Sequence, residues 1–107
     1  MKKNKTRPKE AENLFEELGF SPDESRILAL KAQLAAIIVR TVKKRGLNQK
    51  QLGKLWDVPQ PRVSEVMSGK LRLISIERLI ELLAELGIEV MFKTKPQSHT
   101  VKRASGF

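Results

Sequence analysis

The chain is 107 residues long, the length of a single domain, and 40% of its residues are hydrophobic, which is enough for one small core. It contains no cysteine, so a disulfide framework, a cysteine-based zinc site and a thiol nucleophile are excluded. Its 21 Lys and Arg residues outnumber its 12 Asp and Glu residues, and the formal net charge of +9 favours a polyanionic partner.

The charges are arranged in blocks along the chain. Residues 1–9 and 31–56 carry basic residues and no acid, whereas residues 10–30 and 73–90 are predominantly acidic and the C-terminal tail is basic again. This layout favours one face for a polyanion and another face for a different partner. The simpler alternative is an ordinary solvated surface with basic tails.

No segment of the sequence indicates membrane insertion or catalysis. No apolar stretch approaches the roughly 18 residues of a membrane span, and the basic N-terminus lacks the apolar region of a signal peptide. A cytoplasmic protein with no membrane partner is therefore expected. Paired His, Asp and Glu residues, a Gly-rich phosphate loop and metal-ligand spacing are absent, and His99 lies in the tail with no Cys, Asp or Glu nearby. Neither an enzyme nor a cofactor or metal site is expected.

The first residues predict an arm followed by a short helix. Residues 1–9 are polar and lack periodicity, which predicts a disordered basic arm. Residues 10–19 predict a short amphipathic helix that Gly19 closes. The apolar side of this helix is expected to consist of Leu14, Phe15 and Leu18.

A long second helix is predicted to begin after Ser21. Serine can cap a helix, Pro22 fits the first helical position, and Glu24 completes a capping box. The helix is expected to reach about Lys44 and to stop at Gly46, after basic residues that complement the helix dipole. Its apolar residues are Ile27, Leu30, Leu34, Ile37, Ile38 and Val42.

Two short helices joined by a tight turn are predicted next. Asn48 repeats the capping pattern and begins a helix that ends near Trp56. Residues 57–59 are expected to turn, and residues 60–68 to form a second helix that Gly69 closes. The residues spaced to face inward and hold the two helices together are Leu52, Val58, Val63 and Val66.

Special backbone residues surround this turn. Gly53 is expected to let the second helix approach the first closely, and Asp57 to tolerate a left-handed backbone in the turn. Pro59 and Pro61 fall at the cap and in the first turn of the second helix, where backbone amides have no partner within the helix. The two prolines therefore predict a stiff helix start around Gln60 rather than a helix break.

A last helix and a strand are predicted at the C-terminal end. Ser75 is expected to cap a helix through Leu86, with a core-packing stripe of Ile76, Leu79, Ile80, Leu83 and Leu86. After Gly87 the alternation over residues 88–93 predicts a strand. A lone strand leaves backbone groups unpaired, so pairing with the same strand of a second subunit is expected, through Ile88, Val90, Met91 and Phe92.

These elements predict an all-α fold, with five helices in one domain over residues 10–93 and a short C-terminal β-strand that pairs across a dimer. Residues 94–107 are expected to form a disordered basic tail.

The second short helix carries the residue types that read bases in a major groove. Glutamine bonds bidentately to adenine, arginine binds guanine or phosphate, glutamate accepts from cytosine, and apolar carbons pack on a thymine methyl. The residues expected to read bases are Gln60, Pro61, Arg62, Ser64 and Glu65. An ordinary helical hairpin with a polar face is the alternative, and the charge layout favours double-stranded DNA.

The surrounding polar and basic residues are expected to contact phosphates. Such contacts position a protein on DNA without reading its sequence. The residues assigned to this role are Lys43, Lys44, Arg45, Gln49, Lys50, Lys54, Ser68, Lys70 and Arg72.

The segment LNQKQLGKLWDVPQPRVSEVMSGK, residues 47–70, resembles the helix-turn-helix of the phage repressor/Cro-like (XRE) family. The stretch from about Gly19 to Phe92 is similar to a subgroup that includes HigA-type antitoxins. Three residues depart from the family pattern. The family often has Ala at the position of Gly53 and Gly at the position of Asp57, and it commonly has a capping Ser or Thr at the position of Pro59.

The resemblance implies a dimeric repressor that binds an inverted-repeat operator and autoregulates its operon as the antitoxin of a RelE/HigB-like toxin. The acidic residues 10–24 are a candidate surface for such a basic partner, although packing on the core explains the same helix. A stand-alone phage-like or metabolic regulator, and a protein-interaction module that does not bind DNA, remain alternatives.

Overall fold

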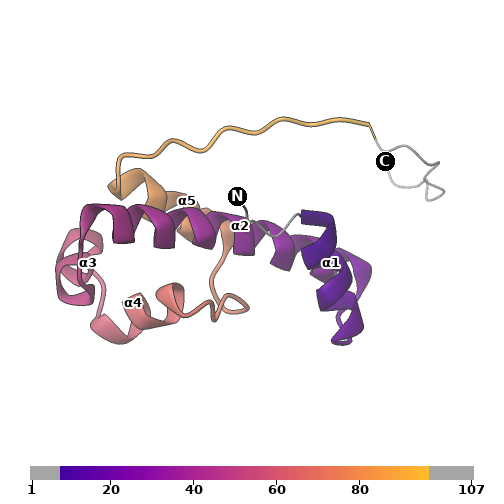
Figure 1. Ribbon diagram of the computed structural model, residues 1–107, viewed down its shortest axis with the longest axis horizontal. Helices are drawn as coiled ribbons and strands as arrows, with labels where there is room; N and C mark the ends of the chain where they lie inside the picture. The colour runs from indigo at the N-terminus through magenta and orange to yellow at the C-terminus, as the bar shows by residue number, and fades with distance from the viewer. Residues whose placement is uncertain (1–7, 97–107) are drawn as a thin grey trace.

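The computed structural model describes residues 8–96, and Figure 1 shows its five helices. These are α1 (Pro8–Glu17), α2 (Pro22–Arg45), α3 (Gln49–Trp56), α4 (Gln60–Met67) and α5 (Ile76–Glu85). The long helix α2 runs through the centre, α1 packs on α2, α4 and α5 also pack against α2, and α3 contacts α4 and α5. The described part is all-helical, as predicted, and none of its helices is long and apolar enough to cross a membrane.

The ends of α2 and α3 are where the capping residues predicted them, whereas α1 begins at Pro8, inside the predicted arm, and ends at Glu17, before the predicted end at Gly19. Ser21 and Glu24 form a reciprocal capping box, in which each backbone N–H donates to the other residue's side chain at 3.1 Å. Asn48 and Gln51 repeat the arrangement at 2.8 Å. Gly46 ends α2 with a left-handed φ of 67°, which a residue with a Cβ adopts less readily.

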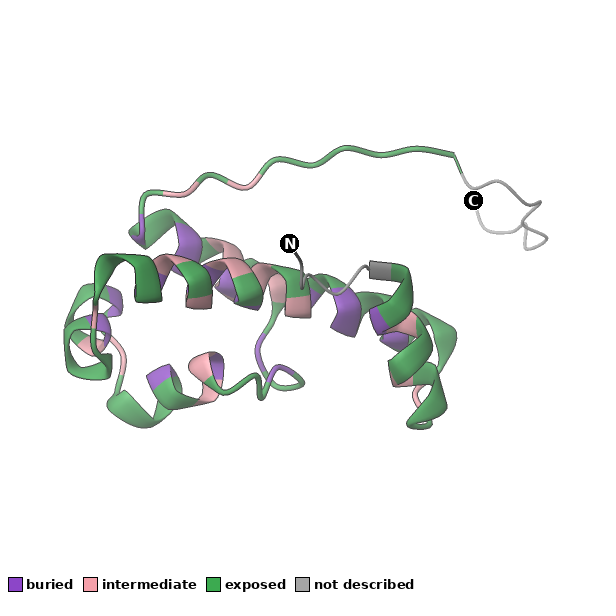
Figure 2. Cartoon of the chain, viewed as in Figure 1, coloured by how far each residue is buried: buried purple, intermediate pink, exposed green. Residues whose placement is uncertain are grey.

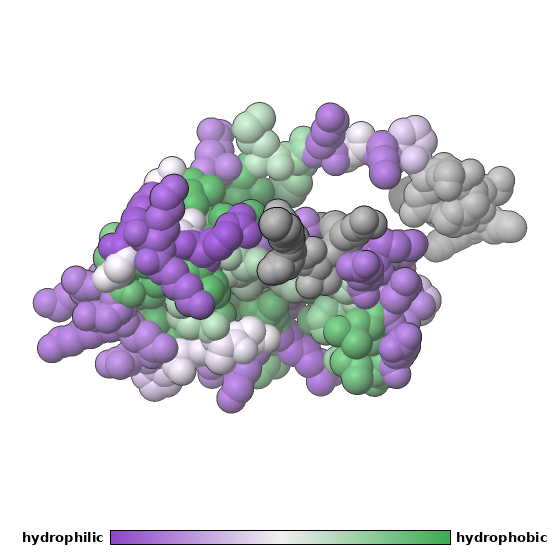
Figure 3. Space-filling model, in the orientation of Figure 1, coloured by the Kyte–Doolittle hydropathy of each residue, from purple (hydrophilic) through white to green (hydrophobic). Residues whose placement is uncertain are grey.

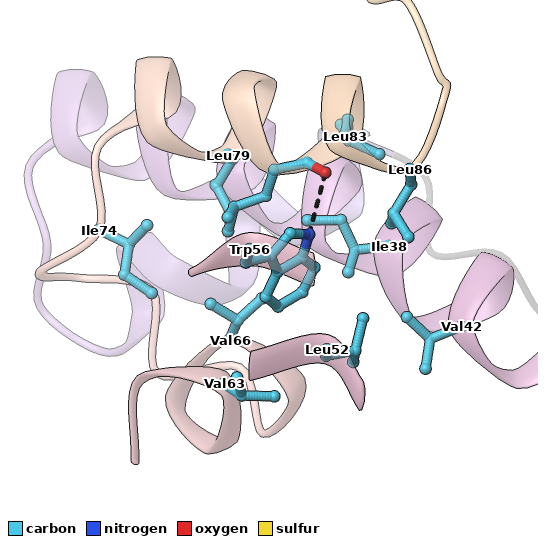
Figure 4. Close-up of a cluster of buried hydrophobic side chains, with 11 residues drawn as sticks. Ile38, Val42, Leu52, Trp56, Val63, Val66, Ile74, Leu79, Leu83 and Leu86 are labelled. Atoms are coloured by element: carbon cyan, nitrogen blue, oxygen red, sulfur yellow. Dashed lines mark hydrogen bonds between the residues drawn. The ribbon is translucent and has the colours of Figure 1, made fainter. Parts of the chain in front are cut away.

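One hydrophobic core joins α2, α3, α4 and α5 (Figures 2 and 4). Leu52, Val63 and Val66 are at most 1% exposed, which confirms their predicted inward orientation, and Val58 packs against the same core. The indole of Trp56 lies within the core, and its Nε1–H donates to the Leu82 carbonyl at 3.2 Å. Helix α3 is therefore fixed to α5 as well as to α4.

The apolar stripe predicted for the N-terminal half of α2 was wrong. Ile27 and Leu30 are about half exposed, and the buried residues there are Ser25, Leu28, Ala29 and Lys31. The physical reason is that this half packs on α1 rather than on the main core, and small residues such as Ala29 let the two helices approach closely.

The predicted apolar side of α1 and the stripe of α5 also need correction. In α1, Leu14 and Leu18 are exposed, whereas Ala11 is buried and Phe15 packs edge-to-face on Phe20 at 6.0 Å. In α5 the fully buried residues include Leu82, which the predicted stripe omitted, while Ile76 and Ile80 remain partly exposed. Helical periodicity alone cannot distinguish these faces, because the neighbours that cover them come from elsewhere in the chain.

The segment after α5 is not a strand in the single chain. Residues 88–96 run as an extended segment along the top of the molecule in Figure 1 without ladder partners. Ile88 and Val90 pack against the core, but Met91 is 82% and Phe92 79% exposed. A strand needs a neighbour to hydrogen-bond with, and no other strand exists within residues 8–96. The predicted tail beyond residue 96, with His99, and residues 1–7 of the arm lie outside the described residues; α1 itself begins at Pro8.

Candidate nucleic-acid interface

Helices α3 and α4 are joined by a turn that the backbone of two residues makes possible. Asp57 takes the predicted left-handed conformation, with φ of 57° and ψ of 48°. The next amide, Val58 N–H, donates to the Gly53 carbonyl at 3.0 Å. A Cβ added to Gly53 would lie 3.2 Å from the Val58 carbonyl oxygen and 3.9 Å from Val63 Cγ2. The closest neighbour of Gly53 is therefore the backbone of the turn. The predicted close approach of α4 is looser, at ordinary van der Waals distance.

The two prolines occupy the predicted positions at the start of α4. Pro59 is the N-cap, with an extended backbone (φ −65°, ψ 151°) and no side-chain cap. Its carbonyl accepts hydrogen bonds from the amides of Arg62 at 3.0 Å and Val63 at 3.4 Å. Pro61 lies in the first turn, where its missing N–H removes no bond of the helix. Because a proline ring fixes the φ angle of its residue, Pro59 and Pro61 restrict the backbone on either side of Gln60.

The outer face of α4 is polar and accessible. Gln60, Pro61, Arg62 and Ser64 are exposed, while Glu65 is intermediate. Arg62 Nη1 lies 3.7 Å from Glu65 Oε1, and both side chains are nearly half exposed. An exposed pair of this kind contributes little to stability, so either side chain is available to another partner at small cost.

A shallow cleft separates α3 from the start of α4. It has a volume of about 440 Å³, and its walls are formed by Gln49, Lys50, Gly53, Lys54, Asp57, Val58, Pro59 and Gln60. The cleft therefore brings the first predicted base-reading residue, Gln60, together with three of the predicted phosphate-contacting residues, Gln49, Lys50 and Lys54.

The basic end of α2 adjoins this region. Lys43, Lys44 and Arg45 form its last turn and are exposed, beside the N-terminus of α3. Figure 3 shows hydrophilic side chains projecting from the end of the molecule where α2 and α3 meet. Ser68 and Lys70 are exposed at the other end of α4, where the Ser68 hydroxyl donates to the Glu65 carbonyl at 3.4 Å.

Arg72 differs from the other predicted phosphate-contacting residues. Its guanidinium carbon lies 5.4 Å from the centre of the Phe20 ring, at the corner between α1 and α2. It lines a second cavity and not the cleft between α3 and α4. The sequence offered no signal for this contact, because Phe20 and Arg72 are brought together only by the packing of the segment after α4 on α2.

The chain is similar to known helix-turn-helix proteins over most of its length. Residues 14–95 match the family described as a helix-turn-helix domain. A Haemophilus influenzae protein, named only as an uncharacterised HTH-type transcriptional regulator, is 33% identical over 75 residues, which cover 70% of this chain and 76% of that protein. A solved structure whose name places it in the XRE family of transcriptional regulators has a TM-score of 0.63 and 28% identity, and the match covers 78% of this chain and 97% of that one. The chain therefore belongs to the XRE-type helix-turn-helix family of transcriptional regulators, a class that acts by binding DNA and not by catalysis.

Proposed function

We propose that the protein is a dimeric, sequence-specific repressor that inserts α4 into the major groove of an inverted-repeat operator. The observation that carries this proposal is the exposed polar face of α4 beside the cleft that Lys50 and Lys54 line. Bases are read in the major groove, whereas cations beside the reading helix bind the phosphates that flank it. Two copies related by a two-fold axis place their reading helices about one helical turn of DNA apart.

Each residue of α4 has a specific role in this proposal. Gln60 reads adenine, Arg62 binds guanine or a phosphate, and Glu65 accepts from cytosine. Pro61 offers apolar carbons to a thymine methyl, and Ser64 bonds to either kind of base edge. The phosphate contacts come from Lys43, Lys44, Arg45, Gln49, Lys50, Lys54, Ser68 and Lys70, all of which are exposed.

Base reading and phosphate binding are separable by two substitutions. Gln60→Ala is expected to reduce discrimination between the operator and a mutated operator by about 1–3 kcal/mol, because it removes a bidentate base contact. Lys54→Ala, on the facing wall of the same cleft, is expected to weaken binding to operator and random DNA by similar factors. Fluorescence anisotropy with DNA from upstream of the gene measures both.

Leu55→Ala is the matched control, since Leu55 is partly exposed beside Lys54 and carries no charge. Its affinities for both DNA molecules should stay close to those of the unmodified protein. If Gln60→Ala and Lys54→Ala behaved alike on operator and random DNA, α4 would not be the recognition helix.

Dimerisation is proposed to use residues 88–92. Ile88 and Val90 pack on the core of their own subunit, and Phe92, which follows in the same alternation, is 79% exposed. Pairing with the same segment of a second subunit would satisfy the backbone groups and cover the ring.

Phe92→Ala is expected to weaken the dimer about 10²–10⁴-fold, because burying one phenylalanine stabilises by about 1.5–3 kcal/mol and the symmetric dimer loses two. Analytical ultracentrifugation across a concentration series measures the change. Lys93→Ala, the next residue on the opposite side of the alternation, is the control and should leave the dissociation constant almost unchanged. Equal effects of the two substitutions would argue against this interface.

A second candidate function, that of an antitoxin, is favoured by the surface of α1. Leu14 and Leu18 are exposed, and Glu16 and Glu17 lie between them. Figure 3 shows an apolar area at the α1 end of the molecule, away from the end where α2 and α3 meet. An acidic surface with exposed apolar side chains suits a basic RNase of the RelE/HigB kind.

Co-purification with the product of the neighbouring gene tests the antitoxin proposal. A stable complex that Leu14→Asp with Leu18→Asp abolishes, while Glu77→Ala on α5 leaves it intact, would support it. If the adjacent gene encodes no small basic RNase, or if no complex forms, the stand-alone regulator is favoured. Failure to bind DNA upstream of the gene would instead favour an interaction module that does not bind DNA.

A further inference from the structure

A second cavity lies at the corner between α1 and α2, apart from the cleft between α3 and α4. It has a volume of about 180 Å³ and is lined by Phe20, Glu24, Ile27, Leu28, Lys31 and Arg72. No residue of the first cleft contributes to it. Cavities that hold drug-sized ligands usually measure about 300–1,000 Å³, so this one suits a smaller molecule.

The charged groups around this cavity leave an excess of positive charge. Lys31 and Arg72 are cations, and the carboxylate among the lining residues, Glu24, accepts the Ser21 amide at 3.1 Å. None of these three residues forms an ion pair within the part of the chain that the structure describes. An anion in the cavity would therefore supply the negative charge that balances Lys31 and Arg72.

Lys31 is the unusual member of this group because it is only 9% exposed. Its Nζ donates to the carbonyls of Leu71 at 3.1 Å and Arg72 at 3.3 Å. An ammonium group has three N–H donors, and among residues 8–96 these two carbonyls take two of them, which leaves one donor for another acceptor. A buried cation held only by neutral carbonyls is stabilised further by a nearby negative charge.

The remaining walls are apolar and well held. Phe20 contacts the Phe15 ring edge-to-face and lies beneath the Arg72 guanidinium, so neighbours fix it on two sides. Ile27 and Leu28 add aliphatic surface from the first turns of α2. We propose that the cavity binds a small organic carboxylate, with its acid group at Lys31 and Arg72 and its apolar body against Phe20 and Ile27.

The site adjoins the segment that follows α4. The two carbonyls that Lys31 holds belong to that segment, and the Lys70 amide donates back to the Glu65 carbonyl of α4 at 3.0 Å. A bound carboxylate that draws Lys31 or Arg72 toward itself would weaken the hydrogen bonds between Lys31 and this segment. The position of the C-terminal end of α4, to which the segment is bonded, would then change as well. This consequence rests on the proposed function, whereas carboxylate binding does not depend on it.

Isothermal titration of the full chain without DNA tests the site, with benzoate as the probe. Saturable binding of benzoate is expected, with inorganic phosphate and the cationic analogue benzylamine at least about tenfold weaker. Arg72→Gln is expected to weaken benzoate binding by at least about tenfold, the loss that follows from removing one charge-assisted hydrogen bond. Lys50→Gln, in the other cleft, is the control and should bind benzoate normally.

Lys31→Met provides a second variant that keeps the length and apolar stem of the side chain. It should fold, as judged by circular dichroism, and lose benzoate binding; if it does not fold, Arg72→Gln decides. The proposal is overturned if benzoate does not saturate, if phosphate binds as tightly as benzoate, or if Arg72→Gln binds benzoate unchanged. Because no DNA is present, these outcomes are independent of whether the protein is a repressor.

Discussion

Binding to the operator is expected to weaken about 10³–10⁵-fold when the salt concentration rises from about 50 to 200 mM, if a dimer makes roughly 6–10 phosphate contacts. The reason is counterion release: each phosphate that a Lys or Arg neutralises frees condensed cations, and added salt opposes their release. In the proposed function these contacts come from exposed cations at the end of α2 and along α3, namely Lys43, Lys44, Arg45, Lys50 and Lys54.

The salt dependence is measured as the slope of log K against log salt concentration, by anisotropy on the DNA upstream of the gene. Lys54→Ala should reduce the slope by about one unit per subunit. Arg78→Ala is the matched control, because its guanidinium already pairs with Glu81 at 2.9 Å on α5, and its slope should not change. A slope near zero, or equal slopes for both variants, would contradict phosphate binding by this surface.

Replacing Trp56 by alanine is expected to destabilise the fold by about 3–5 kcal/mol, a large part of the stability of a small domain. The side chain is 4% exposed, and it links α3 to α5 through its packing and through the Nε1–H bond to Leu82. Its loss leaves a cavity among Leu52, Val66 and Leu79, which cannot close fully because each belongs to a different helix.

Urea denaturation at one fixed protein concentration measures this effect, since association would otherwise shift the transition. Leu55→Ala is the control: it truncates the preceding residue, whose side chain is 42% exposed, and should cost less than about 1 kcal/mol. Trp56→Phe should fall between them, because it keeps most of the packing and loses one hydrogen bond. Equal destabilisation by Trp56→Ala and Leu55→Ala would show that the core is not organised around the indole.

The candidate interface was predictable because its signals are local. The capping boxes at Ser21 and Asn48, the left-handed Asp57 and the proline pair around Gln60 each depend on residues within one turn of the chain. The inward positions Leu52, Val63 and Val66 follow from helical spacing over a short distance. These residues determine both the geometry of the turn and which side of α4 remains exposed.

The positions that the sequence misassigned depend on distant neighbours. The buried face of α2 differs from the predicted stripe because α1 covers the first half of the helix. The contact of Arg72 with Phe20, which the sequence did not indicate, also joins segments that are far apart in the chain. The predicted strand over residues 88–93 needs hydrogen-bond partners, and residues 8–96 contain no second strand to supply them. Periodicity reports which side of an element is apolar, and it carries no information about which other element covers that side.

By itself, the sequence determined where α2 and α3 begin and end, the shape of the turn between α3 and α4, and the polar face of α4, since these are set by interactions among residues close in the chain. Only the tertiary structure decided which faces are buried and where the second cavity lies. Lys31 and Leu71 are 40 residues apart, and the bond between them forms only once the segment after α4 has packed on α2.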